Sequence, residues 1–285
     1  MKSVLRRIYD AGRIYLEVVK RKFSRITSSN NEKNRQLIVC GYPRSGTTMF
    51  YNMLSSSLSE FIIDQWETSA LESIWRYKSH ASKHPIDVFN IDEIEKKNIH
   101  NKDLLVVVLI RDIRDIITSK HLFAPDSYLI GNEGAYTFSG EYPDYKKLFN
   151  GPGIEEYYKS INRLIDSNIN LHLVRYEELV SDPDSEQGKL EREYGLKFEG
   201  KFSDYHLHKD RHKIKYEGKK ASLDNDLVKS SKAVEKTKYI ERWRSEDHRD
   251  RIIEQFKRYP QLFDMLIDYG YEDSKKWFDP YGSQV

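Results

Sequence analysis

Only one cysteine is present among the 285 residues, so no disulfide can form within the chain. This residue, Cys40, lies in the apolar run 37–40, where we expect a small buried side chain rather than a nucleophile. No apolar run reaches the roughly 18 residues needed to span a bilayer. The N-terminus also lacks the uninterrupted apolar core of a signal peptide. These absences predict a soluble, cytoplasmic protein of a reducing compartment.

An excess of charge of one sign is also missing. The chain has 47 basic and 45 acidic residues, which gives a formal net charge of +2. This balance gives no reason to expect nucleic acid as a partner. The length suits one large α/β domain, and a hydrophobic content of 38% is enough to fill its core.

Positive charge is concentrated near the N-terminus. Residues 1–26 contain eight basic and two acidic residues with apolar residues interspersed, which predicts a basic amphipathic helix. Such a helix can contact an anionic membrane surface or dock on its own domain, and the sequence leaves both interpretations open. We divide the chain into this helix with its polar linker, residues 1–30, and one domain, residues 31–285.

From residue 36 onward, short apolar runs alternate with segments of helical periodicity. Strands are expected at 37–40, 61–63, 104–110 and 171–174, and helices at about 46–58, 67–78, 113–121, 155–167 and 246–268. The run 104–110 is apolar on both faces, as in a covered parallel strand. This alternation predicts a three-layer α/β fold with a central, mainly parallel sheet flanked by helices.

Two segments lack clear periodicity. Residues 127–152 are rich in glycine and tyrosine, which predicts a long irregular loop of the kind that often binds ligands. A second segment contains His206, His208 and His212 among several lysines. No cysteine or closely spaced carboxylate completes a ligand set there, so we predict no metal site.

The segment 41–48, with the sequence GYPRSGTT, lies between the first predicted strand and the first predicted helix. Its glycines allow the backbone to fold tightly around an anion, toward which the N–H groups of the helix's first turn point. Arg44 supplies a cationic fork for an anionic oxygen, while Thr47 and Thr48 add hydroxyl donors. The glycine spacing is that of a nucleotide P-loop, but Thr47 stands where that motif has lysine.

The string PRSGTT resembles the 5′-phosphosulfate loop of the sulfotransferase family, including its carbohydrate and protein-tyrosine members. The resemblance covers residues 36–272 and implies a P-loop-like fold. It also implies the donor 3′-phosphoadenosine 5′-phosphosulfate (PAPS), no metal, and an acceptor hydroxyl on a carbohydrate or another biosynthetic molecule. Residues 44–48 would bind the donor, which adds Ser45 and Gly46 to the residues named above. A phosphosulfate end carries less charge than a triphosphate and can be bound without magnesium.

A second pair of donor ligands follows the predicted strand 104–110. Arg111 leaves the carboxyl end of this strand, where open α/β sheets bind ligands, and Ser119 lies eight residues later. This pattern resembles the family's 3′-phosphate motif, which implies that Arg111 and Ser119 bind the 3′-phosphate. Arg114 and Asp115 are expected to support them as ion-pair residues.

Two further segments resemble the family. The string VRYEELV at 174–180 is similar to a strand-to-helix junction of the family, which implies that Tyr176 stacks on the adenine. The segment 238–244 is similar to its closing segment, in which basic residues just before a tryptophan help to hold the 3′-phosphate. Lys236 and Lys238 are the candidates here, although their spacing departs from the family's pattern.

The acceptor hydroxyl needs a base, and the family uses either a glutamate or a histidine. Glu67 lies just after the second predicted strand, like the glutamate of carbohydrate and tyrosine sulfotransferases, and is our first choice. Glu72 follows more than one helical turn later. His84, in the string SKHP, is similar to the Lys-x-His of cytosolic sulfotransferases at an imperfect distance. Arg44 and the loop backbone would stabilise the charge of the transferring group.

Two other functions stay open. A magnesium-dependent P-loop kinase of a small molecule fits the glycine spacing but not Thr47. A non-catalytic binding protein on this scaffold, tethered to membranes by residues 1–26, fits the basic N-terminus. The sequence does not identify the acceptor.

Overall fold

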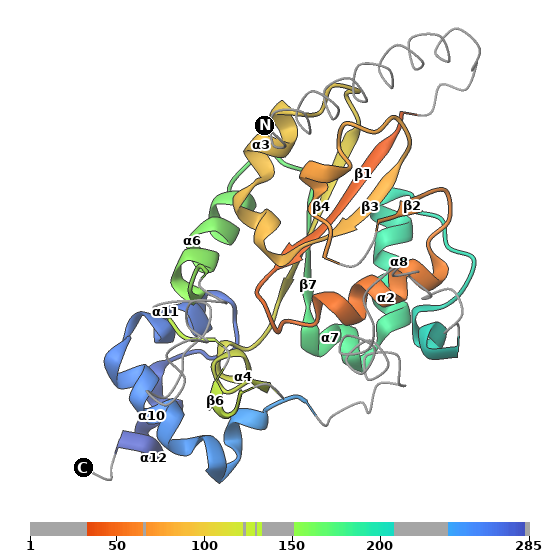
Figure 1. Cartoon of the computed structure of the whole chain (residues 1–285). Helices are drawn as coiled ribbons and strands as arrows, with labels where there is room; N and C mark the ends of the chain where they lie inside the picture. The colour runs from red at the N-terminus through yellow and green to blue at the C-terminus, as the bar shows by residue number, and fades with distance from the viewer. Residues whose placement is uncertain are drawn as a thin grey trace, which may run out of the picture.

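The structure is a computed structural model that describes residues 33–64, 67–121, 124–128, 130–132, 151–207 and 239–282. The predicted N-terminal helix, most of the predicted loop at 127–152, and both Lys236 and Lys238 lie outside the described residues. Figure 1 shows how the helices and strands are arranged.

A five-stranded sheet forms the centre of the described fold, and its strands have the order β2-β3-β1-β4-β7. All four neighbouring pairs are parallel. The strands are β1 (Arg35–Gly41), β2 (Ile62–Ile63), β3 (His80–Lys83), β4 (Asp103–Ile110) and β7 (Leu171–Arg175). A separate antiparallel pair consists of β5 (Lys120–His121) and β6 (Ala124–Tyr128).

The two central strands bury apolar side chains on both faces. Because successive side chains of a strand point to opposite faces, β1 and β4 contribute to two separate hydrophobic clusters. One cluster contains Ile38, Cys40, Val106, Val108 and Ile110. The other contains Leu37, Val39, Leu105, Val107 and Leu109. Cys40 is a buried thiol, as predicted; burial raises its pKa, and nearby Asp87 raises the pKa further.

Helices cover both faces of the sheet (Figure 1). One face carries α2 (Thr47–Ser57), α7 (Tyr176–Ser181) and α8 (Pro183–Tyr194), and the other carries α3 (Ile91–Lys96) and α6 (Ile154–Ile165). A C-terminal group packs around α4 (Ile113–Ile117) and consists of α10 (Arg249–Arg258), α11 (Gln261–Asp268) and α12 (Asp279–Gly282). The predicted three-layer α/β fold with a central, mainly parallel sheet is therefore confirmed.

Strand β3 was not predicted from the sequence, although all four of its residues are buried. Its sequence, HASK, has no apolar run because three of the four side chains are polar. Each of these is bonded inside the fold: His80 to Asp64, Ser82 to Gln36, and Lys83 to Thr48 and Glu67. Polar residues can occupy a buried strand when their hydrogen bonds are satisfied in this way.

The helix expected at 67–78 is wrong. Only a short 3₁₀ helix, Ala70–Glu72, forms there, and at its start the buried carboxylate of Asp87 accepts hydrogen bonds from the Ser69 hydroxyl and the Ala70 N–H. The helix expected at 113–121 ends at Ile117, before β5 begins. The helix expected at 246–268 is divided at Pro260, which lacks the N–H that a continuous helix needs. The remaining 3₁₀ helices are Pro85–Phe89, Phe202–Leu207, Arg242–Arg244, Glu246–His248 and Lys275–Phe278.

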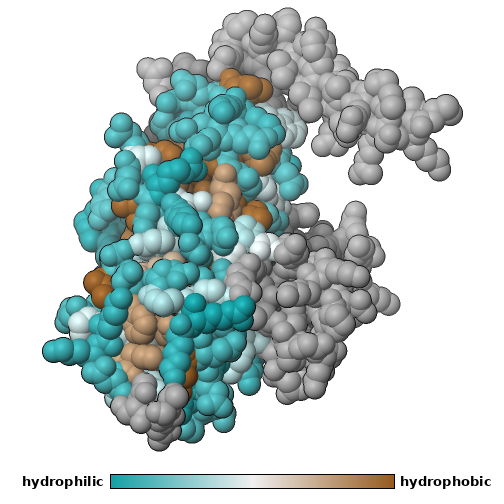
Figure 2. Space-filling model, turned by 90° about the vertical axis from the view of Figure 1, so that its left-hand side faces the viewer, coloured by the Kyte–Doolittle hydropathy of each residue, from teal (hydrophilic) through white to brown (hydrophobic). Residues whose placement is uncertain are grey.

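The surface that carries α3, α6 and α11 is mainly hydrophilic, and its apolar residues lie in small separate patches (Figure 2). In the part of the chain that the structure describes, no helix combines the length and the apolar character needed to cross a membrane.

Candidate active site

The carboxyl ends of four parallel strands meet at one edge of the sheet, as they must when the strands run in the same direction. At this edge β1 leads into the loop before α2, β3 ends at Lys83, β4 leads into Arg111, and β7 leads into Tyr176. Four segments that are far apart in the sequence therefore contribute to one candidate site.

Two glycines shape the loop between β1 and α2, and neither tolerates a side chain. Gly41 has φ of +123°, and a Cβ atom there would lie 2.3 Å from the carbonyl oxygen of Leu109 on β4. Gly46 has φ of +92°, and its Cβ would lie 2.5 Å from the ring of Tyr176. The loop is therefore packed directly against the end of β4 and the start of α7.

Ser45 and Arg44 complete the turn of this loop. The buried hydroxyl of Ser45 donates to the carbonyl of Tyr42 at 2.6 Å, so it holds the loop closed. Arg44 has φ of +68°, which is unfavourable for a residue with a side chain, and backbone strain of this kind clusters at functional sites. Thr47 and Thr48 begin α2, whose first-turn N–H groups have no intrahelical acceptor and so suit an anion.

A buried lysine links this loop to the predicted base. Lys83 is fully buried, and its Nζ lies 3.0 Å from Thr48 Oγ1 and 2.6 Å from Glu67 Oε1. Burial lowers the pKa of Lys83, the Glu67 carboxylate raises it, and the positive charge of Arg44 lowers it further. We call Lys83, Thr48 and Glu67 the lysine cluster.

The predicted base Glu67 reaches this cluster from a strained backbone. Its φ is +54°, and its side chain is 41% exposed although its partner Lys83 has no exposed surface. The alternative His84 follows β3 directly, and its Nδ1 lies 3.5 Å from Asp87 Oδ1. Glu72 is exposed on its 3₁₀ helix. Glu67 is thus the carboxylate that is linked through Lys83 to Thr48, at the end of the loop 41–48.

Arg111 lies at the centre of a second cluster, which also includes Arg44, Tyr176 and the Tyr239 carbonyl. Its Nη1 donates to the carbonyl of Arg44 at 3.1 Å, its Nη2 donates to the carbonyl of Tyr239, and its guanidinium lies 4.3 Å from the ring centre of Tyr176. The buried Nε of Arg111 has no hydrogen-bond partner among the described residues. One donor of Arg111 is therefore unsatisfied within this part of the fold.

Ser119 contacts the loop before α2. It is buried just after α4, and its hydroxyl accepts a hydrogen bond from Arg44 Nε at 3.0 Å. The structure thus brings the predicted donor ligands Arg44, Ser119, Arg111 and Tyr176 together. Burial raises the pKa of Tyr176, whereas the charge of Arg111 lowers it, so the phenol stays neutral at the start of α7.

Arg114 and Asp115 form buried ion pairs, as predicted. Arg114 lies 2.7 Å from Asp112, and Asp115 lies 3.4 Å from Arg111. Asp115 also accepts hydrogen bonds from the backbone N–H groups of Glu241 and Trp243 at 3.0 and 3.1 Å. Burial raises the pKa of Asp115, and Arg111 opposes this shift. These contacts hold the segment that follows Lys236 and Lys238 against Arg111.

No role was predicted for Lys83 from the sequence. The available signal was its position immediately before His84 and Pro85 in the string SKHP, where only the histidine was a candidate. Its importance depends on the unpredicted strand β3, because that strand delivers the side chain to the phosphate loop.

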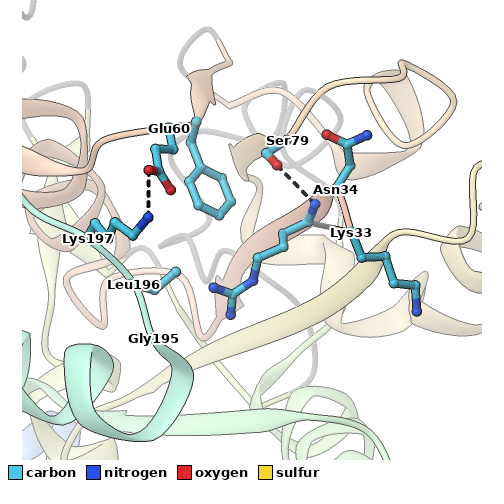
Figure 3. Close-up of a pocket in the computed structure, with 9 residues that line it drawn as sticks. Lys33, Asn34, Glu60, Ser79, Gly195, Leu196 and Lys197 are labelled. Atoms are coloured by element: carbon cyan, nitrogen blue, oxygen red, sulfur yellow. Dashed lines mark hydrogen bonds and ion pairs between the residues drawn. The ribbon is translucent and has the colours of Figure 1, made fainter. Parts of the chain in front are cut away.

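A surface pocket lies away from this site (Figure 3). It has a volume of about 290 Å³ and is lined by residues from the amino-terminal edge of the sheet, including Arg35, Glu60, Ser79 and Lys197. Two of its charged groups are paired, since Lys197 Nζ lies 2.8 Å from Glu60 Oε1. This pocket is at the opposite edge from the phosphate loop and contains none of the predicted site residues.

A sequence model of the sulfotransferase domain matches residues 34–269, which include every element of the site described above. The chain belongs to the sulfotransferase family. Membership in this family supports an enzyme with sulfotransferase activity rather than a kinase. Across the described residues, no group of three or more histidine, cysteine or acidic side chains is placed to hold a metal ion.

Several solved sulfotransferase structures are similar to this sulfotransferase. The sulfotransferase domain from the Synechococcus PCC 7002 olefin synthase has 14% sequence identity and a TM-score of 0.46, with 76% of this chain and 90% of that chain covered. The domain from the curacin biosynthetic pathway has 14% identity and a TM-score of 0.38, with coverage of 72% and 84%. Mouse sulfotransferase SULT7A1, complexed with PAP, has 13% identity and a TM-score of 0.43, with coverage of 82% and 84%. Among curated protein sequences, none matches this sulfotransferase significantly.

Proposed function

We propose that this sulfotransferase uses PAPS as its donor and transfers the sulfuryl group to a hydroxyl of its acceptor. The observation that carries the proposal is the contact between the two predicted half-sites for the donor, which are the loop at 41–48 and the pair Arg111 and Ser119. Arg44 donates to Ser119 through its side chain at 3.0 Å, and Arg111 donates to the backbone carbonyl of Arg44 at 3.1 Å. A single nucleotide with a 5′-phosphosulfate and a 3′-phosphate can therefore contact both half-sites at once.

The two ends of the donor would be bound by different groups. The first-turn N–H groups of α2 and the Arg44 guanidinium would bind the 5′-phosphosulfate. Arg111 and Ser119 would bind the 3′-phosphate, and Arg111 would exchange its contact with the Tyr239 carbonyl for a charged oxygen. Tyr176, which lies against both Gly46 and Arg111, would hold the two ends in register and present its remaining edge to the adenine.

The lysine cluster supports an in-line transfer without magnesium. Thr48 occupies the place where a nucleotide P-loop has the hydroxyl that binds magnesium, and here that hydroxyl accepts a hydrogen bond from the Lys83 ammonium. The ammonium would supply the positive charge that the metal supplies in a kinase. It would stabilise the charge on the equatorial oxygens of the sulfuryl group as the bond to the leaving phosphate breaks.

Glu67 would complete the reaction as the base. The acceptor oxygen attacks sulfur, the sulfur–oxygen bond to the 5′-phosphate breaks, and the proton of the acceptor hydroxyl passes to the Glu67 carboxylate. The products are a sulfate ester and adenosine 3′,5′-bisphosphate (PAP). The partly exposed carboxylate can meet an acceptor from solvent, whereas the buried Lys83 faces the loop.

The first test compares nucleotide binding by titration calorimetry. PAP should bind to the wild-type protein about 30- to 150-fold more tightly than adenosine 5′-monophosphate (AMP), because Arg111 and Ser119 add charge-assisted hydrogen bonds to the extra phosphate. Labelled PAPS should then be consumed with a panel of glycan, lipid, peptide and phenol acceptors in the presence of EDTA. Equal affinity for PAP and AMP would remove the donor assignment, and turnover of Mg-ATP alone would support the kinase.

A further inference from the structure

The chain reverses direction immediately after α11 and returns to the candidate active site. Gly270 has φ of +68°, and the N–H groups of Gly270 and Tyr271 donate to the carbonyls of Ile267 and Leu266, each at 2.8 Å. Such a turn commonly ends a helix and redirects the chain. We call residues 269–272 the C-terminal turn; all but its first residue lie beyond the 34–269 region that the family model matches.

Tyr271 is linked to the backbone of Asp112, the residue after Arg111, through the carboxylate of Glu177. Its hydroxyl donates to Glu177 Oε2 at 2.9 Å, and Glu177 Oε1 accepts a hydrogen bond from the N–H of Asp112 at 3.0 Å. Burial raises the pKa of Tyr271, and Glu177 raises it further, so the hydroxyl keeps the proton that it donates. Glu177 thus bridges the C-terminal turn and the end of β4.

Glu272 is also linked to Asp112, through the side chain of Arg114. Its carboxylate pairs with Arg114 Nη1, while Arg114 Nε and Nη2 lie 3.0 and 2.7 Å from the two carboxylate oxygens of Asp112. Arg114 is buried and lies against Trp243 and Trp277, with ring centres 4.0 and 4.6 Å from its guanidinium. Arg114 therefore has little freedom to move, and it holds the carboxylate of Asp112, whereas Glu177 holds its N–H.

The first residue of the turn contacts the ends of two other strands. The Tyr269 hydroxyl lies 3.0 Å from the hydroxyl of Tyr42, which follows β1. The Tyr269 carbonyl accepts a hydrogen bond from Arg175, the last residue of β7, and the Arg175 guanidinium lies 5.1 Å from the ring centre of Tyr271. The turn consequently joins the ends of β1, β4 and β7, three of the four strand ends that build the site.

We propose that Tyr271 and Glu272 are positioning residues that set the orientation of Arg111 toward the donor's 3′-phosphate. This inference rests on the proposed function. The turn does not contact Arg111 or Tyr176 directly. It holds the residue that follows each of them in the chain, Asp112 and Glu177, and so restrains the direction in which each side chain leaves the backbone.

The test measures the affinity ratio of PAP to AMP in single variants. Tyr271→Phe and Glu272→Gln should each reduce this ratio about three- to tenfold, the loss expected when one net hydrogen bond no longer restrains a ligand. Affinity for AMP, which lacks the 3′-phosphate, should stay nearly constant. The matched control is Tyr158→Phe. It removes a tyrosine–carboxylate contact between α6 and Asp268, the last residue of α11, and this contact is not linked to Asp112. It should leave the ratio unchanged.

Two comparisons separate positioning from general stability and from failure of the proposed function. In an Arg111→Ala background, Tyr271→Phe should cause no further loss of the ratio, because the side chain that it orients is gone. A wild-type protein that binds PAP and AMP equally overturns the donor assignment itself. A wild-type protein that prefers PAP, with both variants retaining the full ratio or weakening both ligands equally along with the melting temperature, overturns this inference alone.

Discussion

Two buried lysines occupy opposite edges of the same parallel sheet, and their surroundings differ. Lys83 ends β3 at the carboxyl edge and is bonded to the Thr48 hydroxyl and the Glu67 carboxylate. Lys102 precedes β4 at the amino edge, is 3% exposed, and donates to Gln36 Oε1 at 3.1 Å and to the Ser73 carbonyl at 3.4 Å. Both side chains give up hydration, and Lys83 is bonded to a carboxylate that is open to solvent.

The partners of these lysines explain the difference. Gln36, Ser73 and Ser82 form a closed set of hydrogen bonds at the amino edge, since Gln36 Nε2 donates to both serine hydroxyls at 3.0 and 3.3 Å. At the carboxyl edge, Arg44 and Glu67 both have positive φ, and Glu67 is bonded to Lys83 with a side chain that is partly exposed. A buried charge in a closed set is part of the scaffold, whereas one in a strained and partly exposed set suits catalysis.

The largest expected effect separates the two lysines by substitution. Lys83→Met should lower turnover about 10³-fold, the loss seen when a preorganised donor to a developing charge is removed. Its free energy of unfolding should change by less than about 1 kcal/mol, because the apolar chain removes the cost of burying a charge and the partly exposed Glu67 carboxylate regains water. Lys102→Met should do the reverse, with turnover per folded molecule retained and stability reduced by about 1–3 kcal/mol. Chemical denaturation and single-turnover assays with PAPS measure both quantities, and equal kinetic losses in the two variants would break the comparison.

A second prediction sharpens the role of the exposed partner. Glu67→Gln should lower turnover about 10²-fold while leaving PAP affinity nearly intact, because the amide keeps the shape of the carboxylate but cannot accept the proton. His84→Ala is the comparison variant at the same strand end. If Glu67→Gln remained active and His84→Ala failed, the histidine near Asp87 would be the base, and Glu67 would serve Lys83 alone.

Arg111 offers a third, smaller effect at the carboxyl edge. Arg111→Ala should weaken PAP binding by about 2 kcal/mol and leave AMP binding almost unchanged, since the lost hydrogen bonds are charge-assisted ones to the 3′-phosphate. Calorimetry of both nucleotides measures the difference. A parallel loss for AMP would indicate that Arg111 acts by holding Tyr176 and the Arg44 carbonyl, and the 3′-phosphate would need another ligand.

The sequence was informative where chemistry is local and uninformative where it depends on packing. The positions of the loop at 41–48 and of Arg111 at the ends of buried strands could be predicted, because each directly follows an apolar run. The donor-binding roles of Arg111 and Ser119 rest on the family resemblance and stay predictions. Lys83 could not, because HASK becomes a strand only through pairing with β1 and β2. The contact of Arg111 with the Tyr239 carbonyl joins residues 128 positions apart, and no local pattern encodes it.

The smallest expected effect concerns the pocket of about 290 Å³ at the amino edge, which is an alternative place for a ligand to bind. Lys197 pairs there with Glu60 at 2.8 Å, and both side chains are more than half exposed. Exposed pairs of this kind contribute about 0–1 kcal/mol, so Lys197→Ala should change the free energy of unfolding by no more than that. PAP affinity and turnover should both equal the wild-type values, because the pair lies across the sheet from the phosphate loop. Calorimetry and PAPS turnover, measured beside Lys83→Met, provide the contrast. A several-fold loss of PAP affinity in Lys197→Ala would mean that an anion of the donor is bound at the amino edge, and the division of the sheet into a scaffold edge and a catalytic edge would then fail.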